Sequence, residues 1–306
     1  MTANKIIIIG TGYVGKELAR QAIDAGLEVV GTTRNDETIQ TLHDLGATVY
    51  RWSVDDEQAP WVSHLGPDTA VVYSIPTLFR SYQEVTETDG VGSMPRHIIP
   101  IDRVLTLCEE RGCDRFIYLS STSVYGDHGG EWVDETSPLR PASPVGKMRA
   151  DIESHLMNRN SIGAVTIARL VGIYGPGRTL LDYLQSGRYS LVNGGKKVTN
   201  RIHVHDIVRA ILAIIDQAPR DPRIYNLTDG HPQTVRDLIE FITSETGIDR
   251  PPEESLEEYA RRKGPNSLAR WKNSIRVRND RLRQEFDFQP EYPDVFSGYK
   301  ALLKKH

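Results

Sequence analysis

The stretch Lys5-Ile-Ile-Ile-Ile-Gly10-Thr-Gly12-Tyr-Val-Gly15 lies near the start of the sequence and decides the fold. Its isoleucine run is typical of a parallel strand that is buried on both faces. A helical pattern follows over Val14–Ala25 and ends at Gly26. A Gly-x-Gly-x-x-Gly turn between such a strand and such a helix predicts a dinucleotide-binding site.

Each glycine of the turn has a separate task in that site. Gly10 allows the tight turn, Gly12 lets the backbone approach a pyrophosphate, and Gly15 lets the helix pack close to the strand. The peptide N–H groups where the helix begins, at Tyr13 and Val14, are expected to face the phosphates. We therefore expect these five residues to bind the cofactor.

The end of the second expected strand, Glu28–Thr33, selects between NAD and NADP. An NAD site carries an Asp or Glu about twenty residues after the turn, where it bonds the ribose 2′-hydroxyl. Here Arg34 follows the strand, and the first carboxylate is Asp36. Thr33 and Arg34 can bond and neutralise a 2′-phosphate, which a carboxylate would repel. We therefore expect NADP, with NAD as the less favoured alternative.

Strand-like and helix-like patterns alternate over the first two-thirds of the chain. Further strands are expected at Ala47–Trp52, Thr69–Ile75, Arg115–Ser120 and Ala164–Arg169, and helices at Glu37–Leu45, Ile98–Glu110 and Lys147–Asn158. This alternation predicts an α/β protein with a doubly wound parallel sheet, a Rossmann fold.

The texture changes after Gly175-Pro-Gly177, where segments become shorter and more polar. A helix at His205–Gln217 and a short strand at Ile224–Leu227 are expected to return to the main sheet. The sequence thus predicts a cofactor-binding domain over residues 1–175, to which 203–228 return. Residues 176–202 and 229–306 are expected to form a smaller C-terminal substrate lobe.

Composition narrows the class of function. The 306 residues carry 37 Lys and Arg against 41 Asp and Glu, so a net charge of −4 offers no footprint for nucleic acid. No apolar stretch reaches the length of a membrane span. The two cysteines, Cys108 and Cys113, fit neither a disulfide framework nor a metal site. We expect a cytoplasmic protein with a small-molecule substrate, no metal, no nucleic-acid or membrane partner, and a homodimeric state.

Several further motifs match one family. They are Leu119-Ser-Ser-Thr-Ser-Val-Tyr-Gly126, Arg169-Leu-Val-Gly-Ile-Tyr-Gly-Pro-Gly177, His203-Val-His-Asp206, Tyr225-Asn-Leu and Asn279-Asp-Arg-Leu. Together with the opening turn, they make the chain similar to the extended short-chain dehydrogenase/reductase superfamily, of the NAD(P)-dependent epimerase/dehydratase type. The resemblance covers nearly the whole chain and says little about the reaction.

The catalytic signature of that superfamily is altered in this sequence. Relatives carry Pro-x-Ser-Pro-Tyr-Gly-x-x-Lys, whereas this chain reads Pro141-Ala-Ser-Pro-Val145-Gly-Lys-Met-Arg149. In this frame Val145 takes the place of the Tyr and Arg149 that of the Lys. An alternative frame makes Lys147 the catalytic Lys and puts Ser143 at the Tyr position, so it also lacks a Tyr. The chain therefore resembles the atypical branch, in which Arg149 could still bond the nicotinamide ribose.

By the same resemblance, this sequence keeps some other positions of the family's catalytic pattern and changes others. Ser121 stands where the family keeps its substrate-bonding Ser or Thr. Thr122 and Ser123 replace the acid pair of the dehydratases, which disfavours 4,6-dehydration, and both are expected near the substrate. Tyr125 could serve as an alternative acid, although packing or substrate contact is its usual role in relatives.

The resemblance also implies contacts farther along the chain. Cofactor contacts are expected at Ser74, Ile75 and Pro76 after the fourth strand and at Leu170 and Val171 after the sixth. Tyr174 is expected near the nicotinamide end of the groove. Arg178 and Arg201 could hold a carboxylate or phosphate of the substrate, and Arg80 and Tyr82 are further candidates for the same cleft.

Two functions remain open at this level. The first is an NADP-dependent oxidoreductase or isomerase that acts on a small polar carbonyl or sugar-like substrate with a non-standard proton donor. The second is a non-catalytic NADP(H)-binding sensor or regulatory protein, which the loss of the Tyr would explain.

Overall fold

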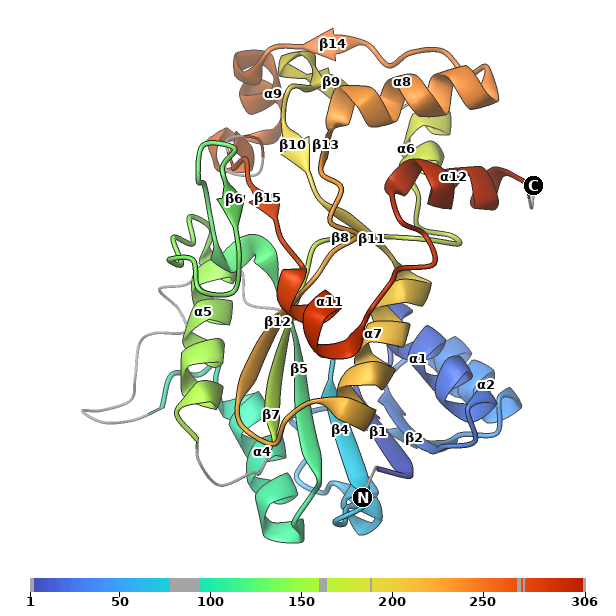
Figure 1. Ribbon diagram of the computed structural model, residues 1–306, viewed down its shortest axis with the longest axis vertical. Helices are drawn as coiled ribbons and strands as arrows, with labels where there is room; N and C mark the ends of the chain where they lie inside the picture. The colour runs from blue at the N-terminus through green and yellow to red at the C-terminus, as the bar shows by residue number, and fades with distance from the viewer. Residues whose placement is uncertain are drawn as a thin grey trace. The chain divides into compact units, whose positions relative to one another are not determined.

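Figure 1 shows the computed structural model, which describes residues 3–77, 94–159, 164–187, 189–268, 271 and 273–304. Arg80 and Tyr82 lie outside these ranges. The chain divides into two compact units. The first consists of Met1–Ser121, Pro144–Arg169 and Ile207–Tyr225, and the second of Thr122–Ser143, Leu170–Asp206 and Asn226–His306.

The first unit is built on a parallel seven-stranded sheet, as the sequence predicts. Its strands lie in the order β12-β7-β5-β4-β1-β2-β3. Their bounds are β1 Lys5–Ile9, β2 Glu28–Thr33, β3 Thr48–Arg51, β4 Thr69–Tyr73, β5 Arg115–Ser121, β7 Val165–Leu170 and β12 Arg223–Leu227. The strand order reverses between β1 and β4, and ligands of such sheets bind at that switch point.

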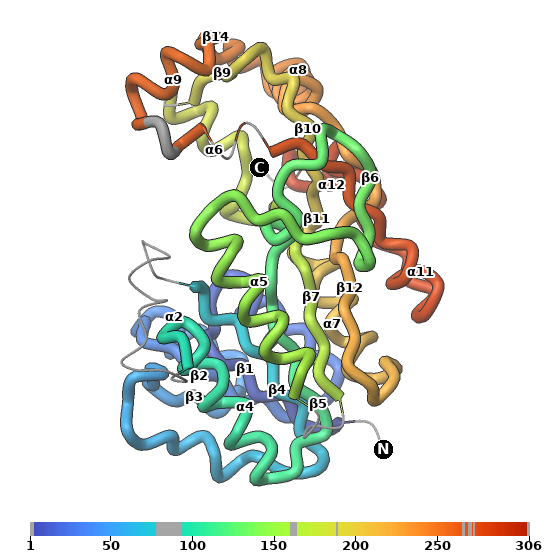
Figure 2. The backbone as a smooth tube through the Cα atoms, turned by 90° about the vertical axis from the view of Figure 1, so that its left-hand side faces the viewer, coloured from blue at the N-terminus to red at the C-terminus, as the bar shows by residue number. Residues whose placement is uncertain are grey.

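Helices cover both faces of this sheet (Figures 1 and 2). Helices α1 (Tyr13–Asp24), α2 (Asp36–Asp44) and α7 (Val204–Gln217) lie on one face, and α4 (Ile99–Arg111) and α5 (Pro144–Met157) on the other. Helix α5 begins three residues earlier than the pattern Lys147–Asn158 indicated. It therefore includes Val145 in its first turn.

The isoleucines of β1 explain why this sheet forms the core of the unit. Ile6, Ile7, Ile8 and Ile9 are all fully buried, as expected for a strand with a helix layer on each side. On one side, α1 packs Leu18, Ala19 and Ala22. On the other, Phe116 and Tyr118 of β5 join a cluster with residues of α4 and α5.

The second unit is assembled from short elements. Its strands pair in twos: β6 (Trp132–Val133) with β15 (Arg276–Val277), β8 (Gly172–Tyr174) with β11 (Arg201–His203), β9 (Leu191–Val192) with β14 (Glu253–Glu254), and β10 (Val198–Thr199) with β13 (Gln233–Thr234). Its helices are α6 (Leu180–Gln185), α8 (Val235–Thr246), α9 (Leu256–Lys263), α11 (Asp280–Phe286) and α12 (Val295–Leu303). Across the described ranges, no helix is both long and apolar enough to cross a membrane.

Candidate functional site

The glycine-rich turn has the geometry that a dinucleotide site needs. Gly10 has a φ of +87°, and a Cβ there would lie 2.6 Å from Cγ1 of Ile75, so only glycine fits. A Cβ at Gly15 would lie 3.1 Å from Ile8 Cγ2, which reflects the close packing of α1 on β1. Gly12 precedes α1 and faces open space, with no side chain capping the helix. The start of a helix that faces open space in this way is the arrangement that binds a phosphate group.

A cavity of about 620 Å³ opens in front of this turn. It is lined by Gly10–Gly12, by Thr32–Asn35 after β2, by Trp52–Asp55 after β3 and by Ser74–Pro76 after β4. The structure thus brings together seven residues expected to hold the cofactor, namely Gly10, Gly12, Thr33, Arg34, Ser74, Ile75 and Pro76. Sequence reasoning missed Trp52–Asp55, although a strand was expected at Ala47–Trp52 and parallel strands end at one edge of a sheet.

The charged side chains among the described residues that line this cavity are Arg34, after β2, and Asp55, after β3. Thr33 is buried, and its hydroxyl oxygen accepts the Asn35 N–H at 3.2 Å. Arg34 is exposed, and its guanidinium has no carboxylate partner in the described part of the chain. Asp36, the first carboxylate after β2, forms an ion pair with Arg51.

The altered signature lies on β5 and α5 of the same unit. Ser121 is the last residue of β5, while Val145 and Arg149 occupy successive turns of α5, and all three are partly buried. Neither Val145 nor Ser121 carries a group that titrates near neutral pH. A proton for a substrate would therefore have to come from another group.

A buried ion pair that the sequence did not reveal fixes α5 to the sheet. Glu153 on α5 accepts hydrogen bonds from Arg169 on β7, at 2.7 Å from Nη2 and 3.0 Å from Nε. It also accepts one from the Ser120 hydroxyl on β5 at 2.6 Å. All three residues are less than 5% exposed. An Arg within an apolar strand pattern was the available signal, because a buried charge requires a partner.

Tyr125 and Thr122 make structural contacts in the second unit. Tyr125 is fully buried and its hydroxyl donates to Oδ1 of Asn226 at 2.7 Å, which favours packing over an acid role. Thr122 donates to the carbonyl of Leu170 at 3.4 Å, and Ser123 lies beside it in a 3-10 turn. The Val171 N–H donates to the Leu227 carbonyl at 3.4 Å.

A second cavity, of about 500 Å³, lies within the second unit and contains the expected substrate residues Tyr174, Arg178 and Arg201. Most of its other side chains are rings and cations that the sequence reading did not single out: Tyr183, Tyr189, Tyr259, Trp271, Tyr299, Arg262 and Lys263. Among the residues that the structure describes, no Asp or Glu lines it. Nε of Arg201 is buried and has no hydrogen-bond partner among the described residues. Such a cavity suits an anionic ligand with a flat ring.

Tyr174 is held rigidly at the wall of this cavity. Its ring stacks on Tyr299, with centroids 5.5 Å apart and planes at 15°, and meets His203 edge-on at 5.1 Å. Burial raises the pKa of the Tyr174 phenol above its usual range, so the hydroxyl stays protonated. Its hydroxyl lies 3.4 Å from the Asp294 carbonyl.

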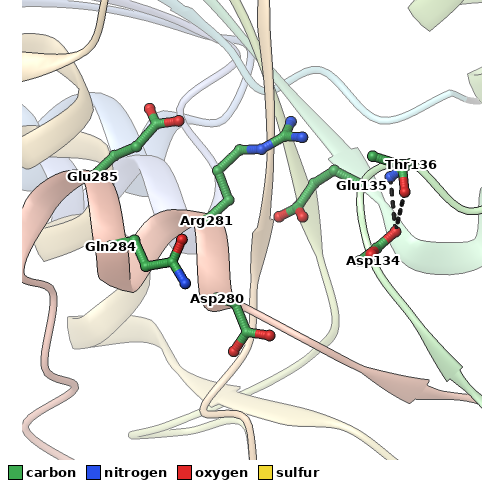
Figure 3. A pocket seen from close by; sticks show the side chains of 7 residues that line it. All are labelled: Asp134, Glu135, Thr136, Asp280, Arg281, Gln284 and Glu285. Carbon is green, nitrogen blue, oxygen red and sulfur yellow. Dashed lines mark hydrogen bonds between the residues drawn. The ribbon is translucent and has the colours of Figure 1, made fainter.

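A third hollow, of about 240 Å³, is shown in Figure 3 and is acidic. Its lining contains Asp134, Glu135, Asp280 and Glu285 against the single cation Arg281. The Asp134 carboxylate accepts bonds from Thr136, and burial raises the pKa of Glu135. Among the described residues, no group of His, Cys, Asp and Glu is arranged to hold a metal ion. This hollow does not suit an anionic cofactor.

Known proteins resemble this chain over most of its length. Protein YeeZ of Escherichia coli K12 is 27% identical over 95% of this chain and 97% of that protein. A ketoreductase of Stigmatella aurantiaca that acts on a 4-farnesyl-dihydroquinoline-1-oxide is 25% identical over 78% of this chain and 72% of its own. The structure of a conserved protein of unknown function from Silicibacter pomeroyi superposes with a TM-score of 0.82, at 27% identity and 99% coverage of both chains.

The model of one protein family matches residues 6–228, which contain the glycine-rich turn, the seven-stranded sheet and the altered signature. That match spans well over half of the chain. Together with the parallel sheet and the cavity at its switch point, it shows that the chain belongs to the NAD dependent epimerase/dehydratase family.

Proposed function

We propose that this protein is an NADP-dependent oxidoreductase or isomerase that acts on a small carbonyl or sugar-like substrate carrying an anionic group. The observation that carries this proposal is the cavity at the glycine-rich turn, with Thr33 and Arg34 on its rim. A nicotinamide bound there supplies or accepts the hydride. The proton must then come from a group other than a Tyr on α5.

The proposed preference for NADP over NAD rests on the charge of the 2′-phosphate and of the side chains that would face it. A phosphate on the 2′ position brings close to two negative charges and three acceptor oxygens at neutral pH. Arg34 offers a guanidinium that no described carboxylate engages, and Thr33 adds a hydroxyl. An NAD site would instead need a free carboxylate after β2, whereas Asp36 is paired with Arg51.

The substrate class rests on the cavity of the second unit. Arg178 and Arg201 supply cations, while the rings around them supply flat apolar walls. An anionic group on the substrate would give the buried Nε of Arg201 its missing acceptor. The ketoreductase relative supports a carbonyl as the reacting group.

The first test measures cofactor binding and turnover separately. Isothermal titration with NADPH and NADH should show tighter binding of NADPH. Oxidation of NADPH is then followed at 340 nm with panels of small ketones, aldehydes and nucleotide sugars, and turnover of at least one is expected. Binding of NADPH without turnover of any compound in the panel would contradict the proposal that the protein is an enzyme.

A second candidate function, the non-catalytic sensor, is favoured by Val145, which cannot transfer a proton. A redox sensor must bind NADPH and NADP with different affinities or change conformation between them. Equal affinities, together with identical protease protection in the two complexes, would eliminate that version.

A further inference from the structure

Cofactor preference in this fold depends on the charge of the few residues that follow β2. Here those residues carry opposing charges, because Arg34 attracts a 2′-phosphate and Asp36 repels it. The side chain of Asp36 is 84% exposed, so burial does not suppress its charge. A preference for NADP therefore requires something that weakens the effect of Asp36 on a phosphate at Arg34.

The backbone around these two residues is fixed by side-chain hydrogen bonds. The Thr33 hydroxyl oxygen accepts the Asn35 N–H at 3.2 Å. The Asn35 side chain in turn accepts the Thr38 N–H at 2.8 Å and caps the start of α2. Asp36 is the first residue of that helix, so its place in the chain relative to Arg34 is fixed.

Arg51 reaches both residues from the neighbouring strand. It is the last residue of β3 and lies opposite Thr33 in the parallel register of β2 and β3. Its Nη1 donates to the Arg34 carbonyl at 3.0 Å, and its Nη2 forms the ion pair with Oδ1 of Asp36. The planar guanidinium presents several donors in a fixed fork, so one side chain can make both contacts.

Arg51 itself is not part of the cavity wall. Among the described residues that line the cavity, the cation is Arg34. The Trp52 N–H, directly after Arg51, donates to the Thr33 carbonyl at 3.1 Å, which keeps the end of β3 beside β2. Any effect of Arg51 on a 2′-phosphate would therefore pass through its contact with Asp36.

Building on the proposed function, we propose that Arg51 is a positioning residue that sets the preference of this site for NADP by neutralising Asp36. The bond to the Arg34 carbonyl anchors the Arg51 guanidinium at the end of β2, and the ion pair then holds the Asp36 carboxylate against it. A 2′-phosphate at Arg34 thus meets a neutral pair instead of a free carboxylate. Without Arg51, the same phosphate would face the full negative charge of Asp36.

The expected effect is confined to ligands that carry the 2′-phosphate. That phosphate brings close to two negative charges at neutral pH, whereas the 2′-hydroxyl of NAD brings none. An exposed ion pair contributes up to about fivefold to an equilibrium constant, and salt screens it. The loss of Arg51 should therefore weaken binding of the phosphorylated ligand by about fivefold at low salt, and should not affect the unphosphorylated one.

The first experiment isolates the 2′-phosphate with two fragments, 2′,5′-ADP and 5′-AMP, which differ in that group alone. Titration calorimetry should show that Arg51→Gln weakens 2′,5′-ADP binding about fivefold at low salt and leaves 5′-AMP binding unchanged. Lys5→Gln is the matched control, because Lys5 pairs with Glu28 at 3.4 Å where β1 and β2 begin, at the opposite edge of the sheet. It removes the same charge and should change neither affinity. Unchanged 2′,5′-ADP binding in Arg51→Gln, equal weakening of both fragments, or the same loss in Lys5→Gln would overturn the proposal.

The second experiment removes Asp36 as well. Once Asp36→Asn has removed the carboxylate, Arg51→Gln should have little further effect. The double variant should therefore bind 2′,5′-ADP within about twofold of Asp36→Asn alone, a rescue that a structural defect would not permit. Equal losses from Arg51→Gln with and without Asp36 would overturn the neutralising role and leave the proposed function intact. Because neither fragment contains a nicotinamide, absence of turnover in the wild-type protein would overturn the proposed function instead, and the fragments would still decide the role of Arg51.

Discussion

Gly298 lies in α12 at a point where the helix meets the phenol of Tyr174. A Cβ at this position would lie 2.0 Å from the Tyr174 oxygen and 2.7 Å from two ring carbons. Replacing glycine by alanine within a helix gains about 1 kcal/mol from propensity, but overpacking costs about 1–3 kcal/mol. At so short a distance the overpacking should win.

We therefore expect Gly298→Ala to lower the free energy of unfolding by up to about 2 kcal/mol, the difference between those two effects. Urea denaturation followed by fluorescence measures it. Lys300→Ala, on the exposed side of the same helix, serves as the control and should change stability by less than about 0.5 kcal/mol. Greater stability in Gly298→Ala would mean that Tyr174 moves freely, contrary to its stacking on Tyr299.

At the residue scale, the proposed preference for NADP rests on Arg34. A hydrogen bond to a charged group contributes about 1.5–3 kcal/mol, which corresponds to roughly 10- to 100-fold in affinity. Arg34→Gln should weaken NADPH binding by that factor and change NADH binding little, as measured by titration calorimetry. Arg20→Gln on α1 is the matched control, because Arg20 pairs with Glu17 and Asp24 on its own helix. An equal loss of affinity for NADPH and NADH would mean that Arg34 does not contact the 2′-phosphate of NADPH.

At the scale of elements, the Glu153–Arg169 pair joins α5 to β7, and Ser120 adds β5. Each side chain of the pair is 3% exposed, so removal of one partner leaves a buried charge uncompensated. Glu153→Gln should lower the free energy of unfolding by about 3–5 kcal/mol. Replacing both residues by leucine should cost less than Glu153→Gln alone. The exposed Arg20 offers the contrast, since Arg20→Ala should cost less than about 1 kcal/mol.

The helices and strands differ in how well the local sequence pattern predicts them. The isoleucine run, the glycine turn and the helix stops are local, and β1, α1 and β2 formed as the sequence predicted. The sequence pattern placed the start of this helix at Lys147, whereas α5 begins at Pro144. The predicted range left out the proline, although a proline is well tolerated in the first turn of a helix. The pairing of Glu153 with Arg169 joins residues sixteen apart in sequence and depends on how α5 packs on the sheet.

At the scale of the whole molecule, the two cavities differ in how much of them the sequence could foretell. The cofactor cavity collects the ends of neighbouring parallel strands, and this geometry follows from the order of the elements. The rings of the second cavity come from α6, α9 and α12 and from Tyr189 and Trp271. Their convergence depends on tertiary packing, so only Tyr174, Arg178 and Arg201 were foreseen.

The second unit also holds a buried carboxylate that should make the stability of the protein depend on pH. Asp229 is 1% exposed, and one of its oxygens, Oδ2, has no hydrogen-bond partner in the described chain. Burial raises the pKa of Asp229 to about 8, with Arg201 and the His231 N–H acting in the opposite direction. Asp294 and Asp206 repel its charged form and add to the rise. The unfolded chain ionises at about 4, so between these values the folded state holds one more proton.

The extra proton of the folded state sets the direction in which the free energy of unfolding changes with pH. The stabilising contribution is complete below about pH 4, and it is lost as the pH rises towards about 8, with a slope of up to about 1.4 kcal/mol per pH unit. Asp229→Asn removes the ionisable group but keeps an oxygen that can accept the hydrogen bond from the His231 N–H. That hydrogen bond is 2.9 Å long in the wild-type protein. The free energy of unfolding of Asp229→Asn, measured by urea denaturation from pH 5 to 8, should therefore fall less steeply than that of the wild-type protein. Asp249→Asn, at an exposed position, should follow the wild-type slope. Parallel curves for the Asp229→Asn and wild-type proteins would show that Asp229 is already ionised in the folded state and that Arg201 compensates its charge.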